Sequence, residues 1–360
     1  MPPVKFDPWD QAQLTAMIKR SLTVGKEGSA SPASQIAPSV DVQSRKVKFR
    51  IVEVDAFGVG QFRAPEGNPR QFRSRQRVRD EVIELLLPDE MERINEDTML
   101  QLLSSDPVIS QGAGVDIVTR GKILATRNWR AIEKMRWDAL LSGQFNVTFD
   151  NGSRETIAFD VPSDHFVTPS TLWTNTASAD IVGNVRAWQK KLADDIGFLG
   201  TKIHMNSDTW ELVYNNAGIR SLLSTYGRSL LVPTKDEIAK LFRNEPEIII
   251  YDGGYRDTLA DSVYEGANPN KARGDSNLTK WIPYGKVLIT TDYTLDGERI
   301  ADTPNGQVMV ATGYNSATPV QGPASEMLLD PISHNTNLRH ASAAVPRLLI
   351  PEAFFVATVV

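Results

Sequence analysis

Apolar residues recur with helical spacing in two stretches of the chain. In the first stretch they follow one another at intervals of seven, four, three and seven: Val118, Ala125, Trp129, Ile132 and Ala139. Gly143 stands just beyond them, where a glycine often ends a helix. The pattern predicts one long helix over about 115–142, roughly 42 Å at 1.5 Å per residue. A second, shorter helix is expected over 182–196.

Alternation of polar and apolar residues predicts β-strands elsewhere. The longest such run is Lys46 to Val54, where charged and apolar residues take turns. Two strands, 145–149 and 156–161, flank Asn151-Gly152, a dipeptide typical of tight hairpin turns. Further strands are expected over 201–205, 247–251, 286–291, 307–311, 347–350 and 353–360. The last of them predicts that the end of the chain lies in a core sheet.

Shorter signals complete the central part of the chain. Ser207-Asp208 and Thr234 are expected to cap two helices, the second over 235–242. Residues 252–279 are polar and glycine-rich, which favours a long exposed loop. The chain therefore mixes helices and strands and belongs to the α+β class.

Residues 1–44 resemble an arm more than part of a globular unit. An amphipathic helix is expected over 9–20, with one stripe made of Leu14, Met17, Ile18 and Leu22. Residues 25–44 are rich in Gly, Ser, Ala and Pro and cannot bury enough apolar surface to fold alone. They are either disordered or ordered by something that they lie against.

Residues 45–79 form a long predicted hairpin with little core of its own. This segment carries ten basic and three acidic residues, whereas residues 80–97 carry eight acidic residues and one basic residue. Opposite charges in adjacent segments suit head-to-tail pairing, in which the loop of one copy lies on the acidic patch of the next. The alternative is a cluster of ion pairs within one chain, which contributes little stability.

The candidate contact residues of this pairing come from both segments. They are Arg70, Arg73, Arg75, Arg77, Arg79, Asp80, Glu81, Glu84, Asp89 and Glu90. The arginines from 73 to 79 could also contact the phosphates of a single nucleic-acid strand, with Phe72 stacking on a base. A solvated face or a contact between subunits is favoured because the rest of the chain is acidic.

Composition excludes several classes of protein. The 360 residues include 39 Lys and Arg against 44 Asp and Glu, a formal net charge of −5, which argues against wrapping of nucleic acid. Cysteine is absent, so disulfide frameworks, thiolate zinc sites and cysteine nucleophiles are excluded. No secretion signal and no run of about 18 apolar residues occur, so we expect a soluble protein made in the cytoplasm.

The motifs of catalysis and cofactor binding are not found in the sequence. His165, His204, His334 and His340 form no metal-binding pattern, and Asp164-His165 reads as a turn. The glycine pairs of the chain lack the residues that a dinucleotide or phosphate loop needs. We expect no metal, no cofactor and no enzymatic activity. A hydrolase using carboxylates of the 200–300 region stays open as an alternative.

Five stretches, taken with the order of the elements, carry a resemblance to a known family. The first is a helix over 127–143 that ends in a leucine, a small residue and glycine before a hairpin, and the second is Trp173 to Trp188, a lead-in to a helix that contains alanine and aspartate. The others are Met205 to Trp210 followed by Asn215-Asn216, Ile282 to Ile289, and Ile350-Pro351-Glu352-Ala353. An arm, a charged hairpin, an acidic segment, a long helix, an α/β region and a terminal strand follow in that order. This arrangement resembles the major capsid proteins of tailed phages, more narrowly the lambda-type family, major capsid protein E.

The resemblance implies the Hong Kong 97 capsid fold. It would comprise an N-terminal arm (1–44), an extended loop (45–79) and a peripheral domain (80–200) built on the long spine helix. An axial domain (201–300) would follow, and residues 301–360 would return to the peripheral domain and supply the C-terminal strands. The family is not enzymatic, so no residue is carried over as catalytic.

The same resemblance implies a function. The chain would self-assemble into pentamers and hexamers of an icosahedral head shell that encloses double-stranded phage DNA without reading its sequence. Portal and scaffolding proteins are the implied partners, with a decoration protein left open and no membrane involved. The protein would be made and assembled in the host cytoplasm and end in the virion. An encapsulating nanocompartment and a tail or baseplate protein are the structural alternatives.

Overall fold

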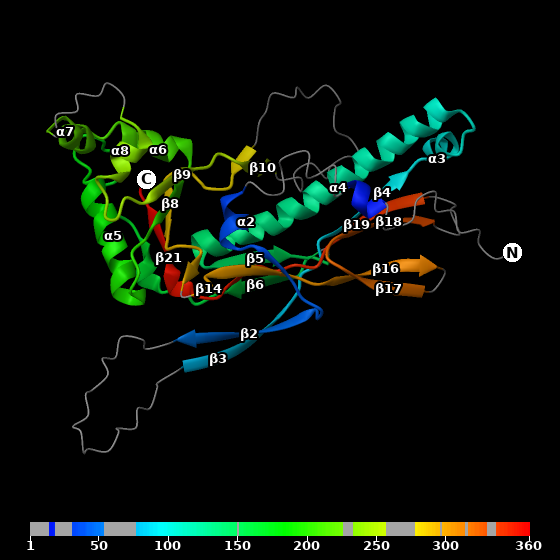
Figure 1. Ribbon diagram of the computed structural model, residues 1–360, viewed down its shortest axis with the longest axis horizontal. Coiled ribbons are helices and arrows are strands. Elements are labelled where there is room, and N and C mark those ends of the chain that lie inside the picture. Colours follow the sequence, from blue (N-terminus) through cyan, green and yellow to red (C-terminus); the bar gives the residue numbers. More distant parts are fainter. Residues whose placement is uncertain are drawn as a thin grey trace, which may run out of the picture.

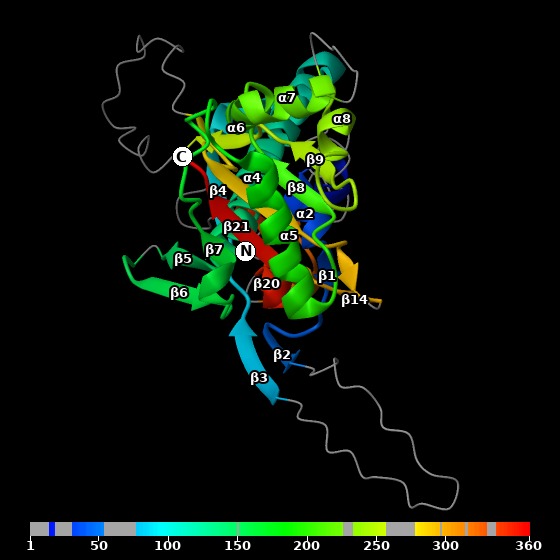
Figure 2. The ribbon, with the colours of Figure 1, turned by 90° about the vertical axis from the view of Figure 1, so that its left-hand side faces the viewer.

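The structure is a computed structural model that describes residues 14–18, 31–53, 77–149, 151–225, 233–256, 278–295, 297–313, 316–329 and 336–360. Its longest element, the helix α4 (Pro107–Ser142), runs along the molecule (Figure 1). A lobe with several short helices lies at one end of α4, and the helix α3 (Glu96–Leu102) lies at the other. The strand pair β2–β3 projects away from the rest (Figure 2).

The remaining elements are shorter helices and strands. The other helices are α2 (Pro32–Ile36), α5 (Ile181–Ile196), α6 (Ser207–Tyr214), α7 (Ala217–Thr225), α8 (Lys235–Ala239) and the 3-10 turns Ser163–His165 and Pro351–Ala353. The first strands are β1 (Ser39–Asp41), β2 (Lys46–Glu53), β3 (Arg77–Glu84), β4 (Asp89–Ile94), β5 (Gln144–Thr148), β6 (Arg154–Ala158), β7 (Phe166–Val167), β8 (Lys202–Met205), β9 (Glu247–Ile250), β10 (Gly254–Arg256) and β11 (Leu278–Lys280). The later strands are β12 (Lys286–Thr290), β13 (Thr294–Leu295), β14 (Glu298–Arg299), β15 (Ala301–Asn305), β16 (Gln307–Gly313), β17 (Ser316–Gln321), β18 (Ala324–Leu329), β19 (Thr336–Ala341), β20 (Arg347–Leu348) and β21 (Phe354–Thr358).

The long helix α4 starts earlier than its apolar pattern predicts. Its first residue is Pro107 rather than a residue near 115, because Asp106 caps the helix by accepting a hydrogen bond from the Val108 amide at 2.9 Å. The predicted end is confirmed. Gly143 has a φ of 67°, and a Cβ there would approach the Val161 side chain to 3.0 Å. Glycine therefore ends the helix for both conformational and steric reasons.

A five-stranded sheet in the order β7-β21-β12-β8-β9 forms the centre of the lobe that also holds α5 to α8. We call this unit the helical lobe. The C-terminal strand β21 lies between β7 and β12, which confirms that the chain end is built into a core sheet. One face of the sheet packs on α5 in a cluster that includes Val185, Leu192, Ile289 and Phe355.

This cluster does not follow the expected domain boundaries at residues 200 and 301. It takes in residues from Trp173 to Leu192, before the first boundary, and from Phe355 to Val359, after the second. A local pattern shows that a strand is apolar, but it does not show which distant strand becomes its neighbour.

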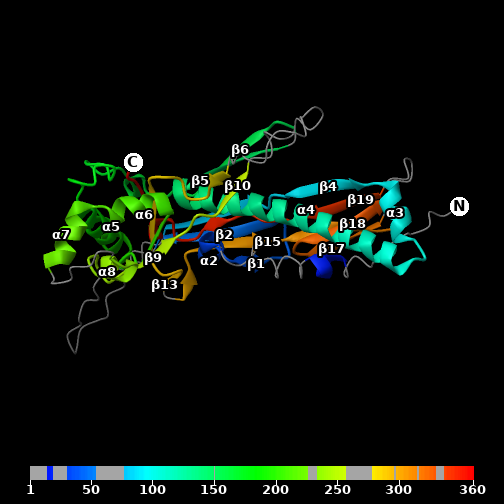
Figure 3. The same cartoon turned by 90° about the horizontal axis from the view of Figure 1, so that it is seen from above.

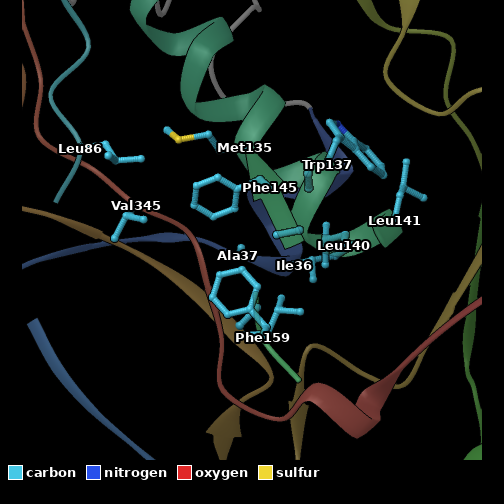
Figure 4. Close-up of a cluster of buried hydrophobic side chains, with 14 of the residues drawn as sticks. Ile36, Ala37, Leu86, Met135, Trp137, Leu140, Leu141, Phe145, Phe159 and Val345 are labelled. Atoms are coloured by element: carbon cyan, nitrogen blue, oxygen red, sulfur yellow. The ribbon is translucent and has the colours of Figure 1, made fainter. Parts of the chain in front are cut away.

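The rest of the molecule is an elongated body along α4, which we call the spine body (Figure 3). Its strands include the sheet β18-β19-β4, the pair β16-β17 and the sheet β1-β15-β20. Its largest hydrophobic cluster joins the last turns of α4 to Phe145, Phe159 and the arm residue Ile36 (Figure 4). The same cluster reaches Leu288 and Val356, on the second face of the five-stranded sheet. The sheet is therefore covered on both sides.

The N-terminal arm is ordered, where the structure describes it, by its own chain. Residues 14–18 are helical, and Leu14 and Ile18 are buried in a cluster with Ile117 of α4, as the amphipathic stripe predicts. Met17 is exposed, so its place on that stripe was wrong. Residues from Pro32 to Asp41 form α2 and β1, and β1 pairs in parallel with β15.

Most shorter elements match their predictions. The β5–β6 hairpin around Asn151-Gly152 and the helix α5 are confirmed. Thr234 caps α8 together with Glu237, although the helix ends at Ala239 rather than 242. The cap of α6 was placed wrongly: Asn206, not Ser207-Asp208, accepts the hydrogen bond from the Thr209 amide.

Candidate assembly surface

The hairpin β2–β3 is the most isolated part of the described structure. Its two strands pair with each other from Lys46 opposite Glu84 to Glu53 opposite Arg77, and with no other described strand. Figures 1 and 2 show the pair leaving the spine body at a single point. A two-stranded ribbon is at best marginally stable in water, so this hairpin needs a further surface to lie on.

The base of the hairpin is rooted in the hydrophobic core of its own chain. Val47 and Leu85 are buried in the cluster of the spine body, Ile83 packs against it, and the Leu85 amide donates to the Arg45 carbonyl at 2.8 Å. One step further out, Val82 is 55% exposed. The core therefore fixes where the hairpin starts and leaves Val82 largely exposed.

The hairpin extends past residue 79, and this changes the charge argument. Asp80, Glu81 and Glu84 lie on β3 itself rather than on a separate acidic patch. The register places Glu84 opposite Lys46 and Asp80 opposite Arg50. From residue 45 to residue 84 the chain carries ten basic and six acidic residues. The net positive charge of the hairpin is therefore smaller than a boundary at residue 79 implies.

The other basic candidates are only partly described. Arg70, Arg73 and Arg75 lie outside the residues that the structure describes. Arg77 and Arg79 are placed by their backbone on β3, as are Asp80 and Glu81, without description of their side chains. The proposed role of these residues in a contact between copies stays a prediction.

The remaining two acidic candidates are engaged within the chain. Asp89 accepts from Arg339 Nε at 2.9 Å and from Nη2 at 2.5 Å, and Arg339 also bonds Glu326. The hydrogen bonds that Arg339 donates to Asp89 raise the pKa of Arg339. Glu90 lies 2.5 Å from Arg127 Nε. Ion pairs within one chain, the alternative stated from the sequence, therefore account for Asp89 and Glu90.

The same strand holds a third ion pair with α4. Glu92 lies 2.7 Å from Arg120 Nη1, and Arg120 Nε bonds Asp116 at 2.9 Å. Three arginines thus neutralise the acidic side chains of β4. A basic loop from another copy would compete with them for the same carboxylates.

A buried ion pair that the sequence analysis missed fixes the arm to the spine. Glu133 and Arg136 of α4 are buried and lie 3.2 Å apart. Glu133 accepts from Ser31, and Arg136 donates to Ser39 Oγ at 3.0 Å and to Thr303 Oγ1 at 2.9 Å. Burial lowers the pKa of Arg136.

This pair had a signal in the sequence. Glu133 and Arg136 stand four and seven residues after Trp129, on the same helical stripe as Leu140. A charged pair on an apolar stripe indicates a buried contact, because a lone buried charge is strongly destabilising. Here the contact holds residues 31 to 41 in place. These arm residues lie between α4 and β15 and contact both.

Two of the buried histidines, His165 and His340, are held by hydrogen bonds. His165 donates or accepts at both ring nitrogens, with the Phe354 carbonyl at 2.8 Å and Asp195 at 2.7 Å. His340 Nδ1 lies 2.7 Å from Ser325 Oγ. Within the described ranges, no group of three or more His, Asp or Glu side chains could hold a metal ion.

Two carboxylates of the described part of the 200–300 region lie close together, but they do not resemble a hydrolytic pair. Asp208 and Asp252 meet at Lys280 Nζ, at 2.6 Å and 3.1 Å. Hydrogen bonds from Ser207 and Lys280 outweigh burial and hold the pKa of Asp252 below its usual range. A general acid would need a raised pKa.

A cleft of about 390 Å³ lies between α2, α4 and β19. It is lined largely by apolar groups, among them Trp129 and Ile132.

Comparison with known proteins gives a clear result for the fold. No family model matches the sequence, and no curated protein matches it. Among solved structures, a prophage protein from Escherichia coli CFT073 described as a capsid protein is similar with a TM-score of 0.61 and 11% identity, over 98% of this chain and 99% of that one. A phage-related protein from Bordetella bronchiseptica RB50 is similar with a TM-score of 0.53 and 12% identity, over 96% of each chain.

The chain therefore has the fold of phage capsid proteins of the Hong Kong 97 type, as the resemblance implied. The similarity runs through nearly its whole length. In the part of the chain that the structure describes, no helix combines the length and hydropathy needed to cross a bilayer.

Proposed function

We propose that the protein is the major capsid protein of a tailed phage. Identical copies would form pentamers and hexamers and close into an icosahedral head shell around double-stranded DNA. The observation that carries this proposal is the capsid fold over 98% of the chain, shared with a prophage protein described as a capsid protein. The role is structural, and assembly takes place in the host cytoplasm before the protein becomes part of the virion.

The projecting hairpin supports self-assembly. A ribbon with apolar residues that pairs with no other described strand of its own chain gains stability when a neighbouring copy covers it. The exposed Val82, on the described part of the ribbon, is one of the side chains that such a contact would bury. Many weak contacts of this kind, repeated in a closed shell, sum to a stable particle.

The charges of the hairpin guide which surfaces meet. We propose that the arginines at 70, 73, 75, 77 and 79 lie on acidic side chains of the next copy, including those of β3. Replacing Arg73, Arg75 and Arg77 by Glu is expected to leave the monomer folded and to block closure. Reversing the acids of β3, Asp80, Glu81 and Glu84, as well should restore part of the assembly, whereas the acids of β4 are left unchanged because arginines of the same chain pair with them. Normal shells from the triple variant would contradict the pairing.

The net charge suits a container for DNA. With 44 acidic against 39 basic residues, the chain carries a net negative charge, so we expect the packaged genome to be enclosed rather than bound in a sequence-specific way. A portal and a scaffolding protein are the proposed partners. A shell that encloses protein cargo is the alternative, because the same fold would serve it.

Electron microscopy of the purified full-length chain tests the proposal. We expect closed shells or rings, and elution far above the 39.8 kDa of one chain. Nuclease-protected double-stranded DNA in particles from phage-producing cells would separate a phage head from a cargo compartment. A chain that stays monomeric at high concentration, with and without its phage partners, would overturn the shell function.

A further inference from the structure

The tip of the β5–β6 hairpin holds an asparagine followed by a glycine in an exposed turn. Asn151 and Gly152 are both exposed, as are Ser153 and Arg154 after them. The two strands pair with each other and with no other described strand, and the hairpin projects from the spine body (Figures 2 and 3). A turn of this kind opens locally at little cost, so its backbone is accessible to chemistry that a packed core prevents.

The side chain of Asn151 and the next backbone nitrogen can react with each other. Attack of the Gly152 nitrogen on Asn151 Cγ closes a five-membered ring, so the reaction needs no encounter between separate molecules. A side chain on the second residue would crowd this approach. Glycine has none, and a Cβ built at Gly152 would meet no atom within 4 Å, so no neighbouring group of the described structure obstructs the site either.

Ser153 holds the oxygen on which charge would develop. The Ser153 amide donates a hydrogen bond to Asn151 Oδ1 at 2.9 Å, and the Ser153 hydroxyl donates to the same oxygen at 2.6 Å. Negative charge moves onto Oδ1 when a nitrogen attacks Cγ. Two donors that already point at this atom lower the barrier to the attack.

A second Asn-Gly pair of the same chain lies in a protected place. Asn305 ends β15, and Gly306 after it is buried. The Gly306 amide, which would be the attacking group, donates to the Ala343 carbonyl at 2.7 Å, so its release requires the core of the spine body to open. The Gly152 amide donates to the Phe149 carbonyl at 3.0 Å within its own exposed turn. Opening that turn costs far less than opening the core.

We propose that Asn151 is a site of spontaneous covalent modification, at which its side-chain amide is lost through attack by the Gly152 nitrogen. This nitrogen gives up its proton and bonds to Asn151 Cγ. The Cγ–Nδ2 bond breaks, and ammonia leaves with that proton. Water then opens the succinimide ring at either of its two carbonyl carbons and yields aspartate or isoaspartate. Water is the one co-reactant, and no electrons are transferred.

The modification changes the hairpin in two ways. A carboxylate replaces a neutral amide, which adds one negative charge to the tip. Isoaspartate also adds one carbon to the main chain, in a turn that the Phe149 amide closes by donating to the Ser153 carbonyl at 2.9 Å. We expect the tip to open while the base stays anchored by the buried Phe145. The change needs no second copy of the chain, so this inference is independent of the proposed function.

The test compares the two Asn-Gly sites of the purified full-length protein, kept folded in mildly alkaline buffer. Peptide mass spectrometry should show the exchange of NH2 for OH at Asn151 at least about tenfold faster than at Asn305, with aspartate and isoaspartate both formed. In urea, where neither site is held, the two rates should become similar. Equal rates in the folded chain, or no conversion at Asn151, would overturn the inference. Aspartate without isoaspartate would mean direct hydrolysis by water and would overturn the attack by Gly152.

A pair of variants tests the part assigned to Ser153. Ser153→Ala removes one of the two donors to Asn151 Oδ1 and should slow the conversion by about threefold to tenfold. Thr156→Ala is the matched control, because Thr156 Oγ1 lies on the same hairpin and donates to Asn146 rather than to Asn151. Its rate should equal that of the unmodified chain. A rate in Ser153→Ala at or above that of the unmodified chain, or equal slowing in the control, would overturn the role of Ser153.

Discussion

The two faces of the five-stranded sheet bury polar side chains in different ways. On the face that packs on α5, Gln189 is completely buried and makes three hydrogen bonds, to the Gly200 carbonyl and to the Arg243 carbonyl and amide. His165 is held at both ring nitrogens. On this side the indole nitrogen of Trp173 is an exception, since it makes no hydrogen bond to the described residues.

The face toward the spine body contains buried polar atoms without partners in the described structure. Both ring nitrogens of His204, the Thr290 hydroxyl and the Tyr293 hydroxyl form no hydrogen bond there. His204 stacks on Tyr293 with ring centroids 6.4 Å apart, and Lys202 Nζ lies 4.1 Å from the Tyr293 ring centre. Each unpaired buried polar group costs about 1–3 kcal/mol.

The difference assigns different roles to the two faces. The α5 face is fixed by directional bonds and defines the helical lobe as one unit. The face toward the spine body is held by apolar contacts, and its buried polar groups without hydrogen bonds lower its stability. For a shell subunit, whose lobes would have to adopt more than one relative position, we expect this second face to be the weaker joint.

The largest predicted effect is on the α5 face. Gln189→Leu removes the partner of the buried Gly200 carbonyl and of two part-buried backbone groups of Arg243, so the free energy of unfolding should fall by roughly 2–4 kcal/mol. Urea denaturation of the isolated subunit measures it. Lys190→Leu, the exposed neighbour on the same helix, is the control and should change the value by less than about 0.5 kcal/mol. A loss below about 1 kcal/mol for Gln189→Leu would contradict the view that directional bonds fix this face.

Lowering the pH should reduce stability mainly through the face of the five-stranded sheet that lies toward the spine body. Burial, aided by the charge of Lys202, lowers the pKa of His204 from 6.5 to about 3. The unfolded chain therefore takes up the proton first. Stability is complete above pH 6.5 and falls by about 1.4 kcal/mol for each unit as the pH drops toward 3. At pH 4.5 the contribution of His204 should be a loss of about 2–3 kcal/mol.

His204→Gln provides the control for this prediction, because glutamine is polar but does not titrate. Tyr293 stays protonated throughout, since burial and the nearby Glu247 and Asp292 raise its pKa to about 12. Asp195 and Asp252, whose pKa values are held low, lose their contribution only when the pH falls below their ordinary value of 3.8. Parallel stability curves for the two proteins between pH 6.5 and 4.5 would rule out the role of His204.

A smaller effect should appear at neutral pH. His204→Leu removes two unpartnered nitrogens, whereas His204→Gln keeps polar atoms at the same site. We expect the leucine variant to be more stable than the glutamine variant by about 1–2 kcal/mol in urea at pH 7. The reverse order would mean that His204 has polar partners that stabilise it, and the contrast between the two faces would be lost.

Much of the fold could be predicted from local patterns. The long helix, its stop at Gly143 and the β5–β6 hairpin follow from periodicity and turn residues. The first turns of α4 were missed because Val108 and Val115 are apolar yet exposed, so they stand out of phase with the buried stripe. The signal that remained was Asp106-Pro107, a cap followed by proline at the first helical position.

The candidate contact surface was harder to predict than the fold. The change of charge sign at Asp80 suggested a boundary, but charge does not end a strand, and β3 continues to Glu84. The partners of Asp89 and Glu90 are Arg339, on β19, and Arg127, on α4. Pairing over such sequence distances depends on which strands become neighbours, and no local pattern records that.

The smallest effect separates two tyrosines that differ in their hydroxyl partner. Tyr293→Phe removes a buried hydroxyl without a partner in the described structure and keeps the ring beneath Lys202, so stability should stay equal or rise by up to about 1 kcal/mol. Tyr251→Phe removes a hydroxyl that bonds Ser31 and should lower stability by about 1 kcal/mol. The same replacement of tyrosine by phenylalanine is thus expected to leave stability equal or raise it at position 293 and to lower it at position 251. Urea unfolding at pH 7 measures both changes. A loss at Tyr293 as large as that at Tyr251 would show that the Tyr293 hydroxyl is satisfied in solution, and it would weaken the case for a penalised joint between the helical lobe and the spine body.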